Sequence, residues 1–274
     1  MKIALAQINF TIGDLEGNAE KMIRAIGRAK GKADLIVFSE LSICGYIPKD
    51  KLNYESFIRH CDKAVEKLVP HSKDIGIIVG APRRSDLLKG KPLYNTAIVM
   101  DQGEIIAEVY KTLLPTYDIF DEYRYFEPNS EFSLVDFRGK KIALTICEDL
   151  WNLNQPWLYK TTPMDELIKQ NPDLMINISG SPYSYNHVEE RRNRMIGNAK
   201  KYQLPLIYVN QVGAHTDIIF DGGSMFIDAD GTIAEELESF EEDFVIVDYR
   251  EDAEYETHSK DQKDSDIELI HKAI

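Results

Sequence analysis

Residues 140–150 read KKIALTICEDL and closely match MKIALAQINF at residues 1–10. A second match lies about thirty residues further on in each half, where PDLMINIS at 172–179 echoes ADLIVFSE at 33–40. Each run is short and apolar, as buried strands are, and a helical pattern separates the two runs of each half. The sequence therefore predicts an α/β protein built from two related β-α-β halves that pack sheet against sheet.

The remaining periodicity fills in this outline. Helices are expected at 18–30, 55–68, 162–170 and 188–203. Further strands are expected at 75–80, 93–100, 104–109, 205–210, 217–220, 223–228 and 243–248, and the turn at 101–103 predicts a hairpin. No linker rich in Gly, Ser or Pro divides the chain, so we expect one domain over 1–250 and an acidic tail or arm over 251–274.

Composition excludes several classes of function. The formal net charge of −14 argues against a nucleic-acid surface, which needs clustered basic side chains. The six histidines show no metal-ligand spacing, so we expect neither a metal nor a cofactor. No apolar run is long enough for a bilayer, the N-terminal run lacks the pattern of a signal peptide, and three cysteines do not form a disulfide framework. We expect a cytoplasmic protein.

Three reactive side chains follow apolar runs directly. Glu40 ends LIVFSE, Lys111 follows IIAEVY and Cys147 follows KIALTI. Taken singly, each favours an ordinary explanation: a solvated charge at a strand end, or a small buried thiol. Taken together, an acid, an amine and a thiol at three strand ends suit the hydrolysis of an amide, because active sites gather at such ends.

The chemistry explains why these three types are needed. A thiol must lose its proton before it attacks, and a carboxylate can take that proton and later give it to departing ammonia. The attack creates an oxyanion, which a buried ammonium and the backbone N–H of Glu148 can stabilise. We therefore predict Cys147 as nucleophile, Glu40 as base and Lys111 as the electrostatic partner.

The segments around these residues resemble the nitrilase, or carbon–nitrogen hydrolase, superfamily, and most of all its glutamine amidase domains of NAD synthetases. The resemblance covers nearly the whole chain through several long runs: MKIALAQINFTIGDLEGN, ADLIVFSELSICGY, YKTLLPTYDIFDEYRYFEP, ICEDLW, NISGSPY and VNQVGAHTDIIFDGGSMFIDADG. It implies an α-β-β-α sandwich and the same catalytic roles for Glu40, Lys111 and Cys147, with Glu122 as a second carboxylate that holds Lys111. By the same matching, the substrate pocket is lined by Tyr117, Phe120, Glu148, Ser181 and Tyr183.

Two departures from the family pattern bear on the substrate. The glutaminase pattern has a Gly and a basic residue after the Ser-Pro motif, whereas SPYSYNH supplies Asn186 and His187. A neutral histidine binds a carboxylate less strongly than Lys or Arg, unless Arg191 or Arg192 substitutes for it. In addition, the full-length synthetases have a Ser-Gly-Gly-x-Asp-Ser loop for ATP, and this sequence contains none.

The leading hypothesis is thus an amidase that forms a thioester on Cys147 and releases ammonia from a small carboxamide. Glutamine is the first candidate, with a separate ammonia-using synthetase as a possible partner, and a homo-oligomer is expected from the resemblance. The first alternative is a stand-alone hydrolase of another ω-amide, an N-carbamoyl compound or a nitrile, with His187 altering specificity. The second alternative is a catalytically idle regulatory subunit.

Overall fold

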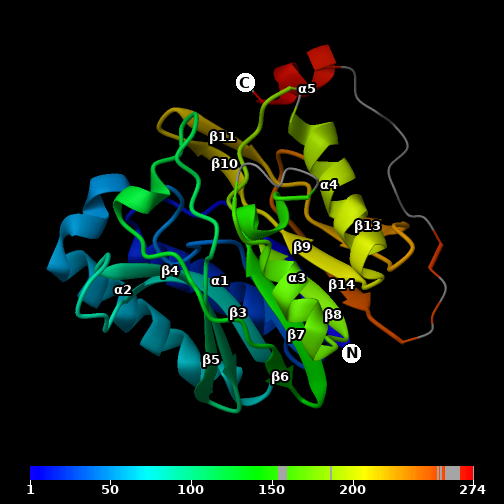
Figure 1. The fold of residues 1–274 in the computed structure, drawn as a ribbon, viewed down its shortest axis with the longest axis horizontal. Helices are drawn as coiled ribbons and strands as arrows, with labels where there is room; N and C mark the ends of the chain where they lie inside the picture. Colours follow the sequence, from blue (N-terminus) through cyan, green and yellow to red (C-terminus); the bar gives the residue numbers. More distant parts are fainter. Residues whose placement is uncertain (154–158, 186, 252, 254, 257–265, 274) are drawn as a thin grey trace.

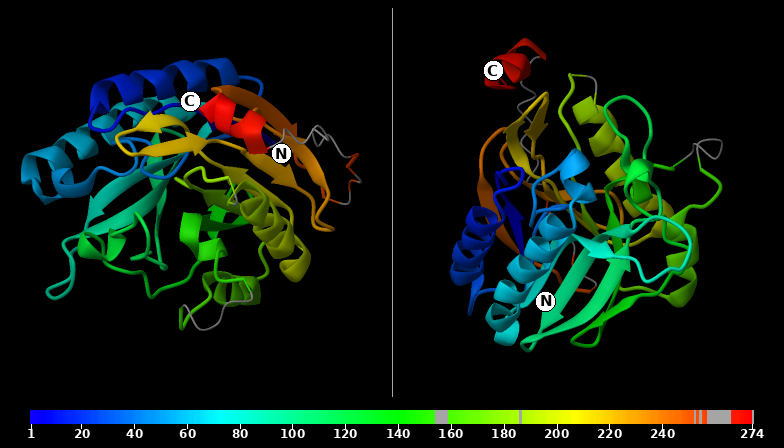
Figure 2. Two further views of the ribbon diagram at one scale, coloured as in Figure 1. Left: turned by 90° about the horizontal axis from the view of Figure 1, so that it is seen from above. Right: turned by 90° about the vertical axis from the view of Figure 1, so that its left-hand side faces the viewer.

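A computed structural model describes residues 1–153, 159–185, 187–251, 253, 255–256 and 266–273. Its core consists of two six-stranded sheets that pack face to face (Figures 1 and 2). The first sheet has the order β14 (Asp243–Asp248), β1 (Lys2–Gln7), β2 (Leu35–Val37), β3 (Gly76–Arg84), β4 (Leu93–Asp101) and β5 (Glu104–Tyr110). The second has the order β13 (Ile233–Glu236), β12 (Met225–Ile227), β9 (Leu206–Val209), β8 (Leu174–Ile178), β7 (Lys140–Ile146) and β6 (Val135–Phe137).

Helices cover the outer face of each sheet (Figure 1). The apolar faces of α1 (Leu15–Ala29) and α2 (Glu55–Leu68) pack on the first sheet. The second sheet is covered by α3 (Pro163–Leu167) and α4 (His187–Tyr202). The molecule is therefore the predicted α-β-β-α sandwich. A small hairpin of β10 (Val212–His215) and β11 (Ile218–Asp221) and a helix, α5 (Asp266–Ala273), are the remaining strands and α-helix of the described residues.

The two halves repeat each other down to single hydrogen bonds. Strands β1 and β2 are parallel with Ile3 opposite Leu35, and strands β7 and β8 are parallel with Ile142 opposite Leu174. In the first half Asp34 accepts a hydrogen bond from the backbone N–H of Lys2 at 2.7 Å. In the second half the corresponding aspartate, Asp173, accepts a hydrogen bond from the backbone N–H of Lys141 at 2.6 Å. The sequence repeat thus corresponds to a structural repeat.

The alternating side chains of these strands explain the layers. Residues on one face of β1 and β2, such as Leu5 and Leu35, meet Ile142 and Leu144 of the second sheet in an interior from which water is excluded. Burying each such side chain contributes about 1.5–3 kcal/mol. The hydrophobic effect therefore holds the two halves together, and it brings the ends of β2, β5 and β7 to one region.

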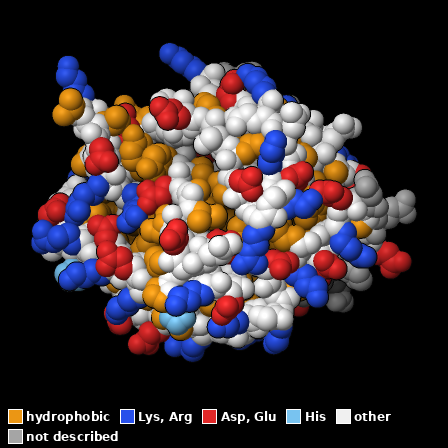
Figure 3. All heavy atoms as spheres, turned by 90° about the horizontal axis from the view of Figure 1, so that it is seen from below, with side chains coloured by type: hydrophobic (Ala, Val, Ile, Leu, Met, Phe, Trp, Pro, Cys, Tyr) orange, Lys and Arg blue, Asp and Glu red, His pale blue; other side chains and the backbone are white. Residues whose placement is uncertain are grey.

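Three short strands were missing from the prediction, namely β6, β10 and β13. Strands of three or four residues carry too little alternation to stand out, and β13 ends in two adjacent glutamates, which break its apolar pattern. The hairpin of β4 and β5 through the turn at 101–103 is confirmed. Among the described residues, no helix combines the length and apolar character needed to cross a membrane. On the face shown in Figure 3, basic side chains are interspersed with acidic ones.

Candidate functional site

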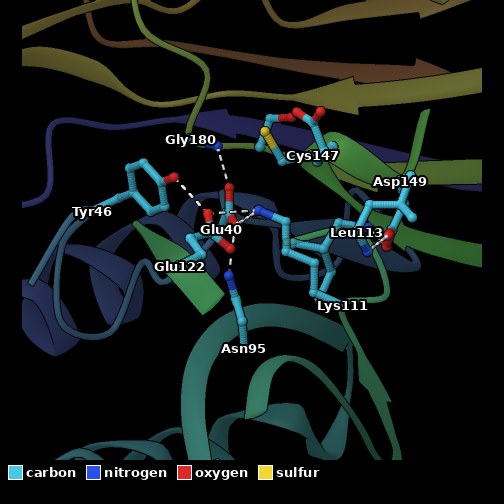
Figure 4. A network of polar contacts seen from close by, with 12 residues as sticks. Glu40, Tyr46, Asn95, Lys111, Leu113, Glu122, Cys147, Asp149 and Gly180 are labelled. Atoms are coloured by element: carbon cyan, nitrogen blue, oxygen red, sulfur yellow. Dashed lines mark hydrogen bonds and ion pairs between the residues drawn. The ribbon is translucent and has the colours of Figure 1, made fainter. Parts of the chain in front are cut away.

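The ends of β2, β5 and β7 place Glu40, Lys111 and Cys147 in one region of the protein interior (Figure 4). All three are buried, with no exposed surface on Glu40 and Lys111 and 5% exposure on Cys147. Figure 4 shows the carboxylates of Glu40 and Glu122 facing the Lys111 ammonium, with Cys147 above it in this view. Residues that lie up to 107 positions apart thus form one cluster.

Lys111 is held between two carboxylates. Its Nζ donates to Glu40 Oε1 at 2.7 Å and to Glu122 Oε1 at 2.8 Å. Although burial by itself would lower the pKa of Lys111, the negative charges of Glu122 and Glu40 raise it well above its ordinary value. The ammonium has three N–H groups, so these two bonds leave one for a further acceptor.

Glu40 is fixed from several sides. In addition to Lys111, its Oε1 accepts a hydrogen bond from Asn95 Nδ2 at 2.7 Å. Its Oε2 accepts one from the backbone N–H of Gly180 at 2.9 Å. A side chain at residue 180 would collide with the Tyr46 ring, 2.8 Å from the position of a Cβ, so glycine is required for this approach. The carboxylate of Glu40 therefore has a single orientation.

Glu122 begins a short 3₁₀ turn (Glu122–Arg124), and its carboxyl group is also buried. Its Oε1 accepts a second hydrogen bond, at 2.6 Å, from the hydroxyl of Tyr46. Burial raises the pKa of Glu122, while the neighbouring Lys111 charge opposes that shift. The family resemblance implied that Glu122 holds Lys111, and in the structure Glu122 accepts a hydrogen bond from the ammonium.

Cys147 lies at the sharp junction between β7 and a 3₁₀ turn (Cys147–Leu150). Its φ is +42°, which is uncommon for a residue with a side chain and costs about 1–3 kcal/mol. Burial raises the pKa of the Cys147 thiol well above its ordinary value, and the negative charge of Glu40 adds to that effect while Lys111 opposes it. The thiol is thus protonated at neutral pH and needs a base to remove its proton.

Asp149 ties the segment after Lys111 to the segment before Cys147. Its Oδ1 accepts from the backbone N–H groups of Thr112 and Leu113 at 3.0 and 2.9 Å, and its Oδ2 accepts from that of Ile146 at 3.0 Å. Burial raises the pKa of Asp149 to about 7, although these backbone hydrogen bonds act in the opposite direction. One buried carboxylate therefore fixes the relative position of two catalytic candidates.

A cavity of about 580 Å³ reaches Glu148, the residue next to Cys147. This volume suits a small molecule. It is lined by Tyr117, Asp118, Ile119, Phe120, Glu148, Trp151, Pro182, Tyr183, Ser184, His187, Glu190, Arg194, Asp217, Ile218 and Ile219. Five of the residues expected in the substrate pocket are in this set, namely Tyr117, Phe120, Glu148, Tyr183 and His187. Ser181, the sixth, is buried outside it, with its backbone N–H bonded to Asn210 Oδ1 at 2.9 Å.

Two arginines that were considered as carboxylate ligands point elsewhere. Arg191 is 1% exposed, and both of its terminal nitrogens bind the carboxylate of Asp221. Arg192 lies 3.5 Å from Glu236. Neither residue is among those that line the cavity, so the lining does not support either as a substitute for the family's basic residue. Position 191 shares a helix face with 187 and 194, but its side chain is buried against Asp221, whereas position 192 points to another side of the helix.

Sequence reasoning missed three residues of this site: Tyr46, Asp149 and Arg194. Asp149 was within the quoted ICEDLW run, and Tyr46 was within the run that contains Glu40. Neither run indicated a contact to Glu122 or to the segment after Lys111, because those contacts depend on how the sheets pack. Arg194 could have been found from its position seven residues after His187, two helical turns along the same face.

No group of three or more His, Cys, Asp and Glu side chains in the described part of the chain is arranged to hold a metal ion. The side chains that the structure brings together at this site are a thiol, a fixed carboxylate and a buried ammonium. Such a set on an α-β-β-α sandwich is typical of hydrolases that cleave carbon–nitrogen bonds outside peptides.

Comparison with known proteins shows the family to which the chain belongs. The sequence profile described as carbon–nitrogen hydrolase matches residues 2–257, and the chain belongs to this family. It is a hydrolase of carbon–nitrogen bonds other than peptide bonds. The chain is 41% identical over 258 residues to a glutamine-dependent NAD(+) synthetase of Synechocystis sp., an alignment that covers 90% of this chain and 46% of the relative.

Two solved structures share the fold of this chain. A glutamine-dependent NAD+ synthetase from Acinetobacter baumannii, in complex with ADP, is 33% identical with a TM-score of 0.90 over 99% of this chain and 50% of that one. An amidase from Nesterenkonia sp. shares the fold, with 23% identity and a TM-score of 0.77 over 91% of this chain and 90% of its own. The chain thus spans about half the length of the synthetase relatives and nearly all of the amidase.

Proposed function

We propose that this protein is an amidase that releases ammonia from a small carboxamide through a thioester on Cys147. The observation that carries the proposal is the buried Lys111 ammonium, bonded to both Glu40 and Glu122 beside a cysteine at a sharp strand end. A buried ammonium with one unused N–H suits an oxyanion, and a fixed carboxylate suits proton transfer.

The proposed reaction has two halves. Glu40 takes the proton from Cys147 Sγ, and the thiolate attacks the amide carbon to form a tetrahedral oxyanion beside Lys111 Nζ and the backbone N–H of Glu148. The carbon–nitrogen bond then breaks, Glu40 gives its proton to the leaving nitrogen, and ammonia departs from a thioester. Water next gives a proton to Glu40 and attacks the thioester carbon. The carbon–sulfur bond then breaks, the acid is released, and Glu40 returns the proton to Cys147 Sγ, which restores the thiol and the carboxylate.

Glutamine is the first substrate to test, because the synthetase relatives that match 90% of this chain are named glutamine-dependent. A free-standing glutaminase would pass its ammonia to a separate synthetase. The alternative is a hydrolase of another ω-amide, an N-carbamoyl compound or a nitrile, and it is supported by His187 in place of a basic residue. We further propose a homo-oligomer, and a domain over 1–250 followed by a C-terminal arm over 251–274.

The test is ammonia release from glutamine, asparagine, an α-keto ω-amide, an aliphatic amide and a carbamoyl amino acid, with Cys147→Ala as the control. Release that depends on Cys147 from at least one of them supports the proposed activity. If glutamine is hydrolysed, the next experiment is to identify the protein that accepts the ammonia. If another compound is hydrolysed and glutamine is not, the result supports the stand-alone hydrolase. Release that persists in the Cys147→Ala variant contradicts the thioester.

A catalytically idle subunit makes a different prediction for the thiols. Cys44 and Cys61 have no exposed surface, whereas Cys147 is 5% exposed and lies beside Glu40. If Glu40 serves as base, iodoacetamide labels Cys147 faster than the other two at neutral pH, and Glu40→Gln abolishes the difference. Equal, slow labelling of all three thiols supports the idle subunit.

A further inference from the structure

The cavity beside Cys147 is strongly asymmetric in charge. Four carboxylates line it, namely Asp118, Glu148, Glu190 and Asp217. Among the described lining residues, Arg194 is the single arginine or lysine.

Arg194 is already committed to other partners. Its Nη1 donates to the backbone oxygen of Trp151 at 2.6 Å, and its Nη2 donates to Glu190 Oε1 at 2.6 Å. Its Nε also donates to the same glutamate oxygen at 3.1 Å, and 13% of the side chain is exposed. The Arg194 charge is therefore neutralised by Glu190 and is not presented to a ligand.

His187 does not supply a cation either. Its ring stacks on Trp151 with 4.5 Å between ring centres and an angle of 10°. Burial lowers the pKa of His187, and the charge of Arg191 lowers it further. The position that holds a basic residue in the family pattern is thus occupied by a ring whose pKa lies below its ordinary value, although Glu190, 3.8 Å from Nδ1, acts in the opposite direction.

Glu148, in contrast, has acceptor capacity left at the inner end of the cavity. Its carboxylate accepts from the hydroxyls of Tyr117 and Tyr159, each at 2.9 Å. A carboxylate has about four lone-pair sites, so a further N–H donor can be accommodated. The aromatic side chains of Tyr117, Phe120, Trp151 and Tyr183 line the same space, and aromatic faces attract cations.

Two of these four acidic groups lie at the exposed rim of the cavity. Asp118 and Asp217 line the cavity, and Asp217 has a distant ion pair, at 4.0 Å, with the exposed Lys49. Such an exposed pair compensates little charge. An acidic rim above aromatic walls and an inner carboxylate attracts positive charge and repels a free carboxylate.

We propose that the cavity recognises amides through a positive charge at the end remote from the amide, with no requirement for a carboxylate. This inference rests on the proposed amidase function and specifies its substrate class: short primary amides that carry an ammonium group. Glutamine carries both an ammonium and a carboxylate, so its two charged groups can be removed one at a time.

Four matched amides form the test: glutamine, 4-aminobutanamide without the carboxylate, 4-carbamoylbutanoate without the ammonium, and butanamide without either. Calorimetry on the Cys147→Ala variant measures their binding. We expect 4-aminobutanamide to bind about tenfold more tightly than butanamide. It also binds at least as tightly as glutamine, and 4-carbamoylbutanoate binds most weakly. Tighter binding of 4-carbamoylbutanoate than of 4-aminobutanamide, or no binding of any of the four, overturns the inference.

Variants separate the local charge from the overall charge of −14. The double substitution Asp118→Asn and Asp217→Asn is expected to reduce the preference for 4-aminobutanamide over butanamide several-fold. The control, Glu20→Gln with Glu104→Gln, makes the same charge change at exposed residues outside the cavity and leaves the preference unchanged. An equal effect of both pairs overturns the inference.

Ammonia release from the same four amides by the unaltered protein tests the function separately. Binding in the expected order without Cys147-dependent release contradicts the amidase and leaves a cation-selective cavity. Release with 4-carbamoylbutanoate as the best substrate supports the amidase and contradicts the charge selectivity.

Discussion

At the scale of single residues, Asp149 couples the position of Lys111 to that of Cys147 through three backbone hydrogen bonds. Asp149→Asn replaces one acceptor oxygen by a donor, so at least one buried N–H loses its partner. We expect this variant to be about 1–3 kcal/mol less stable at pH 5, measured by urea unfolding.

The unaltered protein and the Asp149→Asn variant are also expected to differ in how their stability depends on pH. Folding raises the pKa of Asp149 to about 7, from an ordinary value of about 3.9. The folded protein therefore binds this proton more tightly than the unfolded chain, and the stabilisation from Asp149 declines as pH rises from about 4 to 7. Asparagine does not titrate, so the stability gap between the two proteins should narrow from pH 5 to pH 8. A gap that widens contradicts the shifted pKa.

Substitution of Lys111 tests how much its two buried ion pairs contribute to stability. Lys111→Met leaves the buried carboxylates of Glu40 and Glu122 without their shared cation, and such a change costs about 3–5 kcal/mol. Adding Glu122→Gln should recover part of the loss, because one of the two unpaired charges is removed. The control is Lys169→Met, which breaks an exposed pair with Glu166 and should cost less than about 1 kcal/mol. Equal losses for Lys111→Met and Lys169→Met in urea unfolding would show that the buried pair is unimportant.

At the scale of elements, β3 supports the turn that carries Glu40. A Cβ on Gly80 would lie 2.1 Å from the backbone nitrogen of Leu41, far closer than atoms can approach. Gly80→Ala should therefore displace the Glu40 turn, with a loss of about 3 kcal/mol in stability and about a hundredfold loss of amidase activity. Gly27→Ala, in α1 with nothing within 4 Å, is the control and should raise stability by about 0.5–1 kcal/mol. Urea unfolding and ammonia release test both variants, and normal activity of Gly80→Ala would contradict the role of β3.

The elements that could be predicted from the sequence are those whose pattern is local. The helix at 55–68 matches α2 at both ends, since its apolar side chains repeat at helical spacing and pack on one sheet. The strand ends that carry Glu40, Lys111 and Cys147 followed from apolar runs in the same way. The hydrogen-bond partners of these side chains could not be predicted in this way. Tyr46, for example, contacts Glu122 across 76 positions, and only the packing of the fold brings the two together. Arg191 shows the same limit: its type suggested a ligand for substrate, and its burial against Asp221 makes it a structural ion pair.

At the scale of the whole molecule, the internal repeat explains why the candidate site lies where it does. Each half contributes a parallel pair of strands in the same register, and the two sheets pack face to face. Glu40 follows the pair in one half and Cys147 follows the first strand of the pair in the other. The interface that holds the sandwich together therefore also assembles the reactive groups, and a change that separates the sheets should abolish activity before it unfolds either half.

The last prediction concerns the proposed homo-oligomer and rests on exposed apolar side chains of the outer surface. Leu87 and Leu88 in the loop between β3 and β4 are 54% and 102% exposed, and Tyr123 is 53% exposed. Lys91 of that loop lies over the Tyr123 ring at 5.1 Å, so the loop and the Glu122 turn adjoin. Exposed apolar side chains of this size favour contact with another protein surface.

We therefore expect light scattering at micromolar concentration to give a multiple of the 31.4 kDa chain mass, at a salt concentration that screens the charge of −14. Leu87→Ser with Leu88→Ser should shift the mass towards that of one chain. Ile267→Ser with Ile270→Ser, which changes two exposed apolar residues of α5, should leave it unchanged. A single species of one chain mass in the unaltered protein would contradict the oligomer, and equal shifts in both variants would assign the contact to general surface hydrophobicity instead of the loop.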